Sequence, residues 1–417
     1  MRAVNRDASR PALSAWRFVT VFGTVSLLAD FVYEGARSIT GPLLASLGAT
    51  GLVVGTVTGV GEAAALGLRL VSGPLADRTK RFWSWTIAGY ALTVVTVPLL
   101  GVVGTLWAAV SLVIAERVGK AVRSPAKDTL LSHAASVTGR GRGFAVHEAL
   151  DQIGAVIGPL TVAGMLAVTG GDYAPALGVL ALPGVATLAL LVWLRLRVPD
   201  PADYERDTAP APSAAAGDAG RLPAAFWRYC GFVALTMTGF ATFGLMSFHL
   251  VIRGLLPAAL VPVLYAAAMG ADAVAALASG WCYDRFGGKV LLTLPILSAG
   301  VAVLAFSGSA VAAVAGALVW GAAVGIQEST LRAVVAGMVA PGRRAGAYGV
   351  FAAGLGAAAA AGGALTGWLY DVSVGVLVVA VVGIQVLALV VAMTFRVCSE
   401  QVDDGMSPSR YPVDTSR

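Results

Sequence analysis

The stretch Gly73-Pro-Leu-Ala-Asp77-Arg78-Thr-Lys80-Arg81 occurs a second time, in degraded form, as Gly280-Trp-Cys-Tyr-Asp284-Arg285-Phe-Gly-Gly-Lys289. Each copy lies between two long apolar stretches, and the copies are about half the chain apart. One charged hairpin between apolar segments is ordinary in a membrane protein. Two hairpins at matching places in two halves indicate an internally duplicated membrane protein.

The composition is that of a protein with many membrane spans. Of 417 residues, 57% are hydrophobic and 12% are charged, whereas soluble domains carry about 25% charged residues. Because a helical span needs about 20 mostly apolar residues, the apolar blocks predict a dozen transmembrane helices. The predicted spans are 16–46, 51–72, 83–103, 105–123, 143–168, 173–194, 227–252, 258–281, 290–307, 309–333, 345–369 and 374–396.

Basic residues predict the orientation of these spans. They precede the first span and follow every even-numbered one, with Lys127, Arg140 and Arg142 assigned to the loop after the fourth. The intervening short loops carry almost none, Arg253 being the exception. The positive-inside rule therefore places both termini in the cytoplasm. The net charge of +6 reflects this topology, and we expect no nucleic-acid partner.

The chain divides into two halves around one linker. We expect an N-terminal six-helix bundle over 1–197, a cytoplasmic linker over 198–224, a C-terminal six-helix bundle over 225–397 and a cytoplasmic tail over 398–417. The linker is rich in Pro, Ala and Asp and lacks a hydrophobic period. Glycines crowd the fifth span and the eleventh, where they serve either a moving interface between the halves or static helix packing. Abundant Ala, and Arg in excess over Lys, are typical of a high-GC bacterium, so we expect the bacterial inner membrane.

The repeated motif resembles the loop-2/3 signature of the major facilitator superfamily and its weaker echo in loop 8/9. Gly73, Asp77 and Arg78 match the family's Gly and Asp-Arg, and Lys80 and Arg81 match its basic end. The resemblance implies a conformational latch that favours the outward-facing state; the alternative is a charged hairpin kept for topology. The second copy, with Asp284 and Arg285, departs by having one Lys and extra Gly, which implies a weaker latch there.

Other segments extend the resemblance over nearly the whole chain. Arg123-Ser-Pro-Ala-Lys-Asp128 and Gly325-Ile-Gln-Glu-Ser-Thr-Leu-Arg332 resemble one bacterial branch of the superfamily whose substrates are unassigned. Gly154-x-x-x-Gly158-Pro159 resembles the core of the glycine-proline motif of drug/proton antiporters, although the flanking glycines of that motif are missing. This partial match favours efflux over uptake.

Charged residues inside spans are functional candidates, because each costs about 2.5–3.5 kcal/mol at the centre of a helix in insertion experiments. Asp30, Glu34 and Arg37 share one face of the first span. Arg37 can pair with Glu34, which leaves Asp30 to take up a proton or meet a cation. The alternative is a static ion pair near the extracellular end.

Further acids lie in other spans. His147, Glu148 and Asp151 share one face at the start of the fifth span, either as a proton relay or as partners of nearby arginines. Asp272 has no base within a helical turn, so it needs a partner from another span or stays protonated. Glu116 and Lys120, four residues apart, are expected to pair. Glu328 and Arg332 in the tenth span, also four apart, are either a self-satisfied pair or part of a coupling or substrate site. In the seventh span, residues Phe240, Phe243, Met246 and His249 suit a cavity wall, or else packing or lipid contact.

We therefore expect an all-α membrane protein with the major facilitator fold, two pseudo-symmetric bundles and a central cavity. The hypothesis is a monomeric, proton-coupled exporter of small amphipathic compounds, with Asp30, Glu34, Arg37, Asp272, Glu148, Asp151 and Glu328 as coupling or substrate sites. Its alternatives are a proton symporter for a sugar, organic acid or siderophore, and a transport-dead sensor or assembly partner. No enzyme motif, metal site or cofactor is expected, and the bilayer and protons are the expected partners beside the substrate.

Overall fold

The computed structural model describes residues 13–205, 222–339 and 343–394, and within these ranges it contains helices and no strand. The first part of the chain forms α1 (Ala15–Ser46), α2 (Gly51–Gly67), α3 (Arg69–Thr79), α4 (Phe82–Leu100), α5 (Leu106–Thr138), α6 (Arg140–Val168), α7 (Tyr173–Gly178), α8 (Ala181–Arg197) and η2 (Pro201–Tyr204). The second part forms α9 (Ala224–Thr238), α10 (Phe243–Ile252), η3 (Ala258–Leu260), α11 (Val261–Phe286), η4 (Gly287–Leu292), α12 (Thr293–Ala305), α13 (Ala310–Met338), α14 (Arg344–Val372) and α15 (Val374–Thr394).

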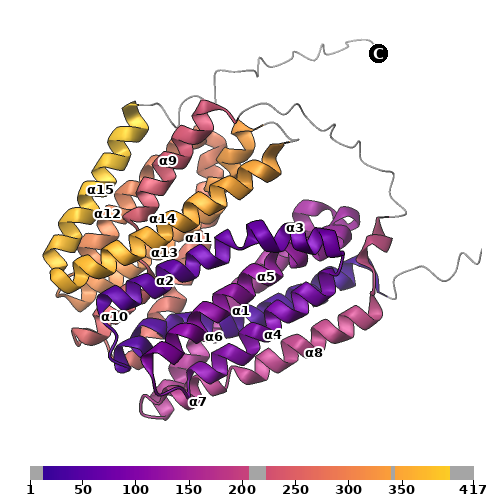
Figure 1. Cartoon of the computed structure of the whole chain (residues 1–417), viewed down its shortest axis with the longest axis horizontal. Coiled ribbons are helices and arrows are strands. Elements are labelled where there is room, and N and C mark those ends of the chain that lie inside the picture. The colour runs from indigo at the N-terminus through magenta and orange to yellow at the C-terminus, as the bar shows by residue number, and fades with distance from the viewer. Residues whose placement is uncertain (1–12, 206–221, 340–342, 395–417) are drawn as a thin grey trace, which may run out of the picture.

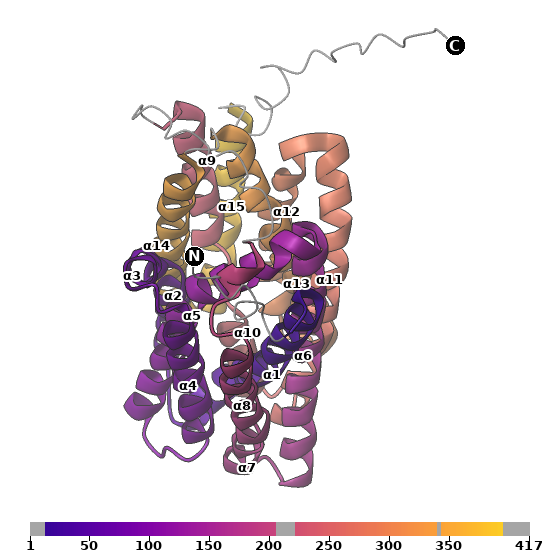
Figure 2. The same cartoon turned by 90° about the vertical axis from the view of Figure 1, so that its right-hand side faces the viewer.

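The helices gather into two groups that follow the order of the chain. Helices α1–α8 lie together, and α9–α15 lie beside them (Figure 1). The groups meet where α2 runs along α14, where α1 packs on α10, and where α6 packs on α11 (Figures 1 and 2). Most of the predicted linker and all of the predicted tail fall in 206–221 and 395–417, outside the described residues.

Among the described residues, ten stretches are long and apolar enough to cross a membrane, whereas the sequence predicted a dozen. Charge explains one difference, because α5 carries Glu116, Arg117, Lys120 and Arg123 within the would-be span. The other is Ala258–Ala305, which counts as one stretch although it joins α11, η4 and α12. A continuous helix of that length would extend about 72 Å, more than twice the thickness of the hydrocarbon core.

Three segments that the sequence assigned to loops are helical. Helix α3 runs through Gly73, Asp77 and Arg78, and the turn comes only at Lys80, which has a left-handed φ of 54°. Asp284 and Arg285 likewise lie in the last turn of α11. Helix α5 continues to Thr138, so the expectation that Lys127 follows the fourth span in a loop was wrong. In α5, the Ala- and Leu-rich sequence over 126–135 favours helix over loop.

The predicted seventh span is broken. Helix α9 ends at Thr238 and α10 begins at Phe243, with residues 239–242 between them. Two side chains replace hydrogen bonds that the break removes: the Thr242 hydroxyl accepts from the Leu245 N–H at 3.3 Å, and the Trp320 indole donates to the Ala241 carbonyl at 3.0 Å. Such partners are needed because irregular backbone is costly within a membrane.

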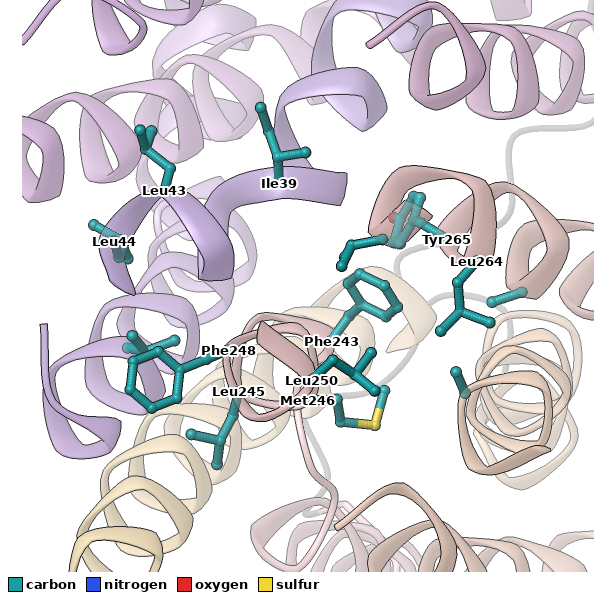
Figure 3. Packing of buried hydrophobic residues seen from close by; sticks show 14 of the residues in the cluster. Ile39, Leu43, Leu44, Phe243, Leu245, Met246, Phe248, Leu250, Leu264 and Tyr265 are labelled. Atoms are coloured by element: carbon teal, nitrogen blue, oxygen red, sulfur yellow. The ribbon is translucent and has the colours of Figure 1, made fainter. Parts of the chain in front are cut away.

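Helix α10 is held between the two halves by apolar packing. Its residues Phe243, Leu245, Met246, Phe248 and Leu250 are all at most 4% exposed. Figure 3 shows them between Ile39, Leu43 and Leu44 of α1 and Leu264 and Tyr265 of α11. The Phe243 ring meets the Tyr265 ring edge-on at 4.6 Å. This packing fixes the start of α10 at the centre of the molecule.

The glycine-rich spans serve different contacts. In α6, a Cβ at Gly154 or Gly158 would collide with the backbone of α1, within one half. In α14, a Cβ at Gly363 or Gly367 would collide with the backbone of α2, in the other half. Only the second set therefore lies at the interface between the halves. The glycines in both sets allow helix backbones to approach closely.

Candidate functional site

A cavity of about 210 Å³ lies between the two halves. Helices α1, α2 and α5 line it from the first half, and α9, α10, α13 and α14 line it from the second. The break between α9 and α10 contributes Phe240, Ala241 and Thr242 to its wall. A cavity at the interface of two repeats, beside a discontinuous helix, is the usual place of a substrate site in secondary transporters.

Glu62 of α2 organises the polar wall of the first half. One oxygen of its carboxylate, Oε1, lies 3.0 Å from Nη2 of Arg37 and 3.4 Å from Nη1 of Arg117. Glu34 and Glu116 lie behind the two guanidinium groups, at 3.7 Å from Arg37 and 3.6 Å from Arg117. The predicted Glu34–Arg37 contact is therefore present, but Glu62 is the closer partner of Arg37.

Glu34 also links the halves. It is 8% exposed, and the Tyr265 hydroxyl of α11 donates a hydrogen bond to its carboxylate from 231 positions away. A charge-assisted hydrogen bond of this kind is stronger than one between neutral groups. Any movement that separates α1 from α11 must break it.

The second half contributes polar groups from α13. Gln327, Glu328 and Arg332 line the cavity, and in the described structure Glu328 and Arg332 form no ion pair with each other. The self-satisfied pair, one of the two alternatives for these residues, is therefore absent, and both side chains are exposed in the cavity lining. Only spacing along the helix suggested that pair, and side chains four residues apart need not converge when an open cavity lies beside them.

The predicted Glu116–Lys120 pair is absent as well. Glu116 contacts Arg117 and accepts from Thr93 at 3.5 Å, whereas the Lys120 ammonium lies 4.0 Å from the centre of the Tyr33 ring. The Arg117 guanidinium lies 4.8 Å from the same ring. The Arg37 guanidinium lies over the same ring at 6.0 Å, so Tyr33 receives three cations through cation–π contacts, which a pattern of charges along one helix does not reveal.

An aromatic wall faces the polar groups. It consists of Phe240, Phe243, Trp320 and Phe351. Two of these were predicted from the seventh span, but Met246 and His249 of the same pattern do not line the cavity. The His249 ring is instead hydrogen-bonded to the Tyr370 hydroxyl at 3.0 Å and the Ser307 carbonyl at 3.2 Å.

A second polar cluster lies between α5 and α6. Lys127 Nζ is 3.1 Å from His147 Nε2 and 3.9 Å from the Asp151 carboxylate, and His147 Nε2 is 3.6 Å from that carboxylate. The structure therefore brings His147 and Asp151 together, as expected, but around a lysine. Glu148 is exposed and forms no ion pair with a described residue, although it lies within electrostatic range of Lys127 and Glu328. Asp30 of α1 is half-buried, within electrostatic range of Lys120 and Lys127.

Asp272 lies at the other contact between the halves. It is 3% exposed, and Gln152 Nε2 of α6 donates to its Oδ2 at 3.5 Å. Its Oδ1 is buried without a hydrogen-bond partner among the residues that the structure describes. The expectation that Asp272 needs a partner from another span is met by this single neutral contact.

The residues of the expected latch lie apart from the cavity. Asp77, Arg78, Lys80 and Arg81 are exposed, and no ion pair joins them to another residue within the described ranges. Arg285 lies over the rings of Trp281 and Phe286, at 5.8 and 5.7 Å. Latch contacts in another conformation therefore remain a prediction.

At the opposite end of α2 the halves are joined directly. The Asp371 carboxylate, at the end of α14, accepts from the backbone N–H groups of Gly51 and Leu52 at 2.7 and 2.8 Å. These are orphan donors of the first turn of α2, and a negative charge there is favourable. The predicted topology makes this the extracellular end.

The sequence reasoning missed Glu62, Asp371 and the role of Lys127. Glu62 carried a usable signal, because it is an acid in the second apolar block, near Gly61 and Gly59. Asp371 lies at the edge of a span, where an acid is unremarkable. Nothing local distinguishes it from a solvated residue.

Comparison with known proteins gives close relatives and distant structural neighbours. Uncharacterized proteins of Mycobacterium tuberculosis and Mycobacterium bovis are each 72% identical to this chain over 389 residues, which is 93% of this chain and 95% of each relative. An uncharacterized MFS-type transporter of Methanocaldococcus jannaschii is 29% identical over 140 residues, which is 34% of this chain and 35% of that protein.

Among solved structures, a bacterial homolog of the human lysosomal transporter Spinster has a TM-score of 0.74 at 13% identity, covering 96% of this chain and all of that chain. The nucleoside transporter NupG has a TM-score of 0.69 at 15% identity, covering 91% of this chain and 98% of that one. A POT family transporter in complex with 5-aminolevulinic acid has a TM-score of 0.73 at 14% identity, covering 95% and 98%. These likenesses confirm the fold. The family profile matches residues 24–327, and the chain belongs to the Major Facilitator Superfamily, whose members are membrane transporters and not enzymes.

Proposed function

We propose that this transporter exports small amphipathic compounds in exchange for protons, by alternating access around the cavity between its halves. The observation that carries the proposal is Glu34, a buried carboxylate that contacts Arg37 of the cavity wall and accepts from Tyr265 of the other half. A proton on Glu34 would weaken its attraction for Arg37. One event would then act both on the cavity and on the contact between the halves.

Other carboxylates support the same reading. Asp272 bridges the halves through Gln152, and Asp30 lies within electrostatic range of Asp151 and Lys127. Buried acids that face a cavity or an interface are the usual proton sites of transporters. We propose Glu34, Asp30 and Asp272 as proton sites, Arg37 and Glu328 as substrate contacts, and Glu148 and Asp151 as second-line candidates.

The proposed direction rests on the amphipathic cavity and on the partial glycine-proline motif. The aromatic wall and the charged wall suit a compound with one apolar and one polar side. Fold likeness does not select a substrate, because the solved neighbours include a nucleoside transporter, a Spinster homolog and a POT family transporter. We further propose inner-membrane placement with cytoplasmic termini, from the distribution of basic residues.

Everted membrane vesicles loaded with a pH-sensitive dye test this function. We expect some member of a panel of amphipathic drugs, sugars, organic acids and siderophores to dissipate the proton gradient in the wild type. Asp30→Asn and Glu34→Gln are expected to abolish the response. The matched control is Asp172→Asn, because Asp172 caps α7 from an exposed turn and Asn keeps that cap.

Two results would count against the proposal. If proton-linked flux persists in both Asp30→Asn and Glu34→Gln, these two residues are not the proton sites. Accumulation of a labelled nutrient in intact cells, without dye response to any exported compound, would favour the symporter for uptake. Free replacement of all the membrane acids would favour the transport-dead sensor.

A further inference from the structure

Two buried donor atoms that make no aligned hydrogen bond with a described residue belong to side chains that line the same cavity from opposite halves. Arg117 is 6% exposed, and its Nη1 makes no aligned hydrogen bond with any described residue, although it lies 3.4 Å from Glu62. Nε2 of Gln327 is also buried without a hydrogen-bond partner there. Both side chains line the cavity. Buried polar atoms are normally satisfied, so two unsatisfied donors facing one space indicate a missing acceptor.

The charges around this space also favour an acceptor. The lining contains three arginines, Arg37, Arg117 and Arg332, and two glutamates, Glu62 and Glu328. Glu62 is already shared between two guanidinium groups. Glu116 and Glu34 contact these guanidinium groups but are not part of the cavity lining. This arrangement orients the arginines before a ligand arrives, and guanidinium groups suit carboxylates through paired hydrogen bonds.

The break between α9 and α10 is a third feature that favours an anionic ligand. Thr242, Phe243 and Gly244, where α10 begins, line the cavity. A helix N-terminus within the membrane carries partial positive charge and free N–H groups, which favour an anionic group. The same turn brings the Phe243 ring beside Trp320, at 5.3 Å between ring centres, so the donors and the aromatic wall are adjacent.

We propose that the cavity binds a small organic carboxylate with a flat apolar body. Arg117 and Gln327 hold the carboxylate at the start of α10, and the apolar body lies against Phe243 and Trp320. The volume of about 210 Å³ is below the roughly 300–1,000 Å³ of drug-sized sites, so the body has one or two rings. This inference rests on the proposed transport function and names its substrate class.

The test compares three probes that share one apolar body: 3-phenylpropionate, its neutral amide 3-phenylpropanamide, and the cation 3-phenylpropylamine. Binding to the purified full chain in lipid nanodiscs is measured by calorimetry, without a proton gradient. We expect the carboxylate to bind about tenfold or more tightly than either analogue, because only its charge-assisted hydrogen bonds satisfy both donors.

Variants locate the site. Arg117→Lys keeps the charge and loses the planar fork, and Gln327→Leu keeps the volume and loses the donor. Each is expected to weaken carboxylate binding by about tenfold and to leave amine binding unchanged. Arg195→Gln, at the exposed end of α8, is the control for loss of one arginine and is expected to bind as the wild type does.

Equal or tighter binding of the amine, no saturable binding of the carboxylate, or full carboxylate affinity in Gln327→Leu would each overturn the proposal. These outcomes are separable from failure of proton-coupled export, which the vesicle assay reports. Carboxylate binding without proton movement would support the proposed carboxylate site and contradict proton coupling. Proton movement driven by amines alone would support proton coupling and contradict the carboxylate site.

Discussion

Asp371 caps the first residue of α2, Gly51, from the end of α14, 320 positions further along the chain. The contact lies beside the glycine-lined crossing of the same two helices, where Gly367 meets the backbone of Gly51. One carboxylate thus satisfies two backbone donors and ties the halves together at the end that the predicted topology places outside. Because it is a contact between halves, alternating access predicts that it forms in one conformation of the transport cycle and breaks in the other.

Asp371→Ala is expected to open this end of the molecule. Loss of such a cap costs about 1–2 kcal/mol, which shifts an open–closed equilibrium roughly tenfold. In a background without the native cysteines, Thr58→Cys in the cavity should react faster with a membrane-impermeant maleimide in intact cells. Asp172→Ala, which removes a cap within one half, is the control, and equal labelling in the two variants would contradict the gating role.

Glu62→Gln is expected to disorganise the polar wall. It leaves Arg37 and Arg117 without the carboxylate that they share, at a cost of about 1–3 kcal/mol in the free energy of unfolding. Transport should fall at least about tenfold, measured as substrate-driven proton movement in vesicles. Glu205→Gln removes an acid from an exposed contact with His133 and should cost at most about 1 kcal/mol. Wild-type transport in Glu62→Gln would show that this acid is dispensable.

Two glycines of α14 allow the same Gly→Ala substitution to be compared at the contact with α2 and away from it. Gly363→Ala places a methyl group against the Gly55 carbonyl of α2, so we expect the halves to separate and both thermal stability and transport to fall. Gly354→Ala meets no atom within 4 Å and should keep or raise stability, by up to about 1 kcal/mol through helix propensity. Thermal unfolding in detergent and vesicle transport measure both effects. Similar behaviour of the two variants would rule out the close crossing as the cause.

Asp272→Asn tests the second interface acid. Asn keeps the size of the side chain and its reach to Gln152, so the fold should be retained while proton-linked flux is lost. Flux is compared with and without an imposed pH gradient, and Asp172→Asn serves as the control outside the interface. Flux that still follows the gradient in Asp272→Asn would exclude this residue as a proton site.

Substitution of a latch residue should change the transport rate and leave the stability of the fold unchanged. Asp77 and Arg78 are exposed and make no ion pair within the part of the chain described, so Asp77→Asn should change the free energy of unfolding by no more than about 0.5 kcal/mol. A latch in another conformation nevertheless predicts a changed transport rate. An unchanged rate with unchanged stability would favour the alternative, a charged turn kept for topology.

Several features of the site follow from the sequence alone. Asp30, Glu34 and Asp272 stand out because a charge in an apolar block is costly, and all three lie in the interior or at the interface. The His147–Asp151 contact follows from helical spacing. The same spacing rule fails for Glu116–Lys120 and Glu328–Arg332, because a helix face decides only which side chains are neighbours. A stronger partner or an open cavity decides whether they pair.

The sequence by itself determined a duplicated, all-helical membrane protein with its acids in identifiable spans, because apolar block length, charge and motif repetition are properties of short segments. The tertiary structure decided that Arg37 prefers Glu62 over Glu34, that the span of α9 and α10 breaks at the cavity, and that Asp371 caps Gly51. Each of these depends on which helix faces converge across tens to hundreds of positions. A carboxylate within reach of two guanidinium groups, or of two free N–H groups, pairs with them whatever its distance along the chain.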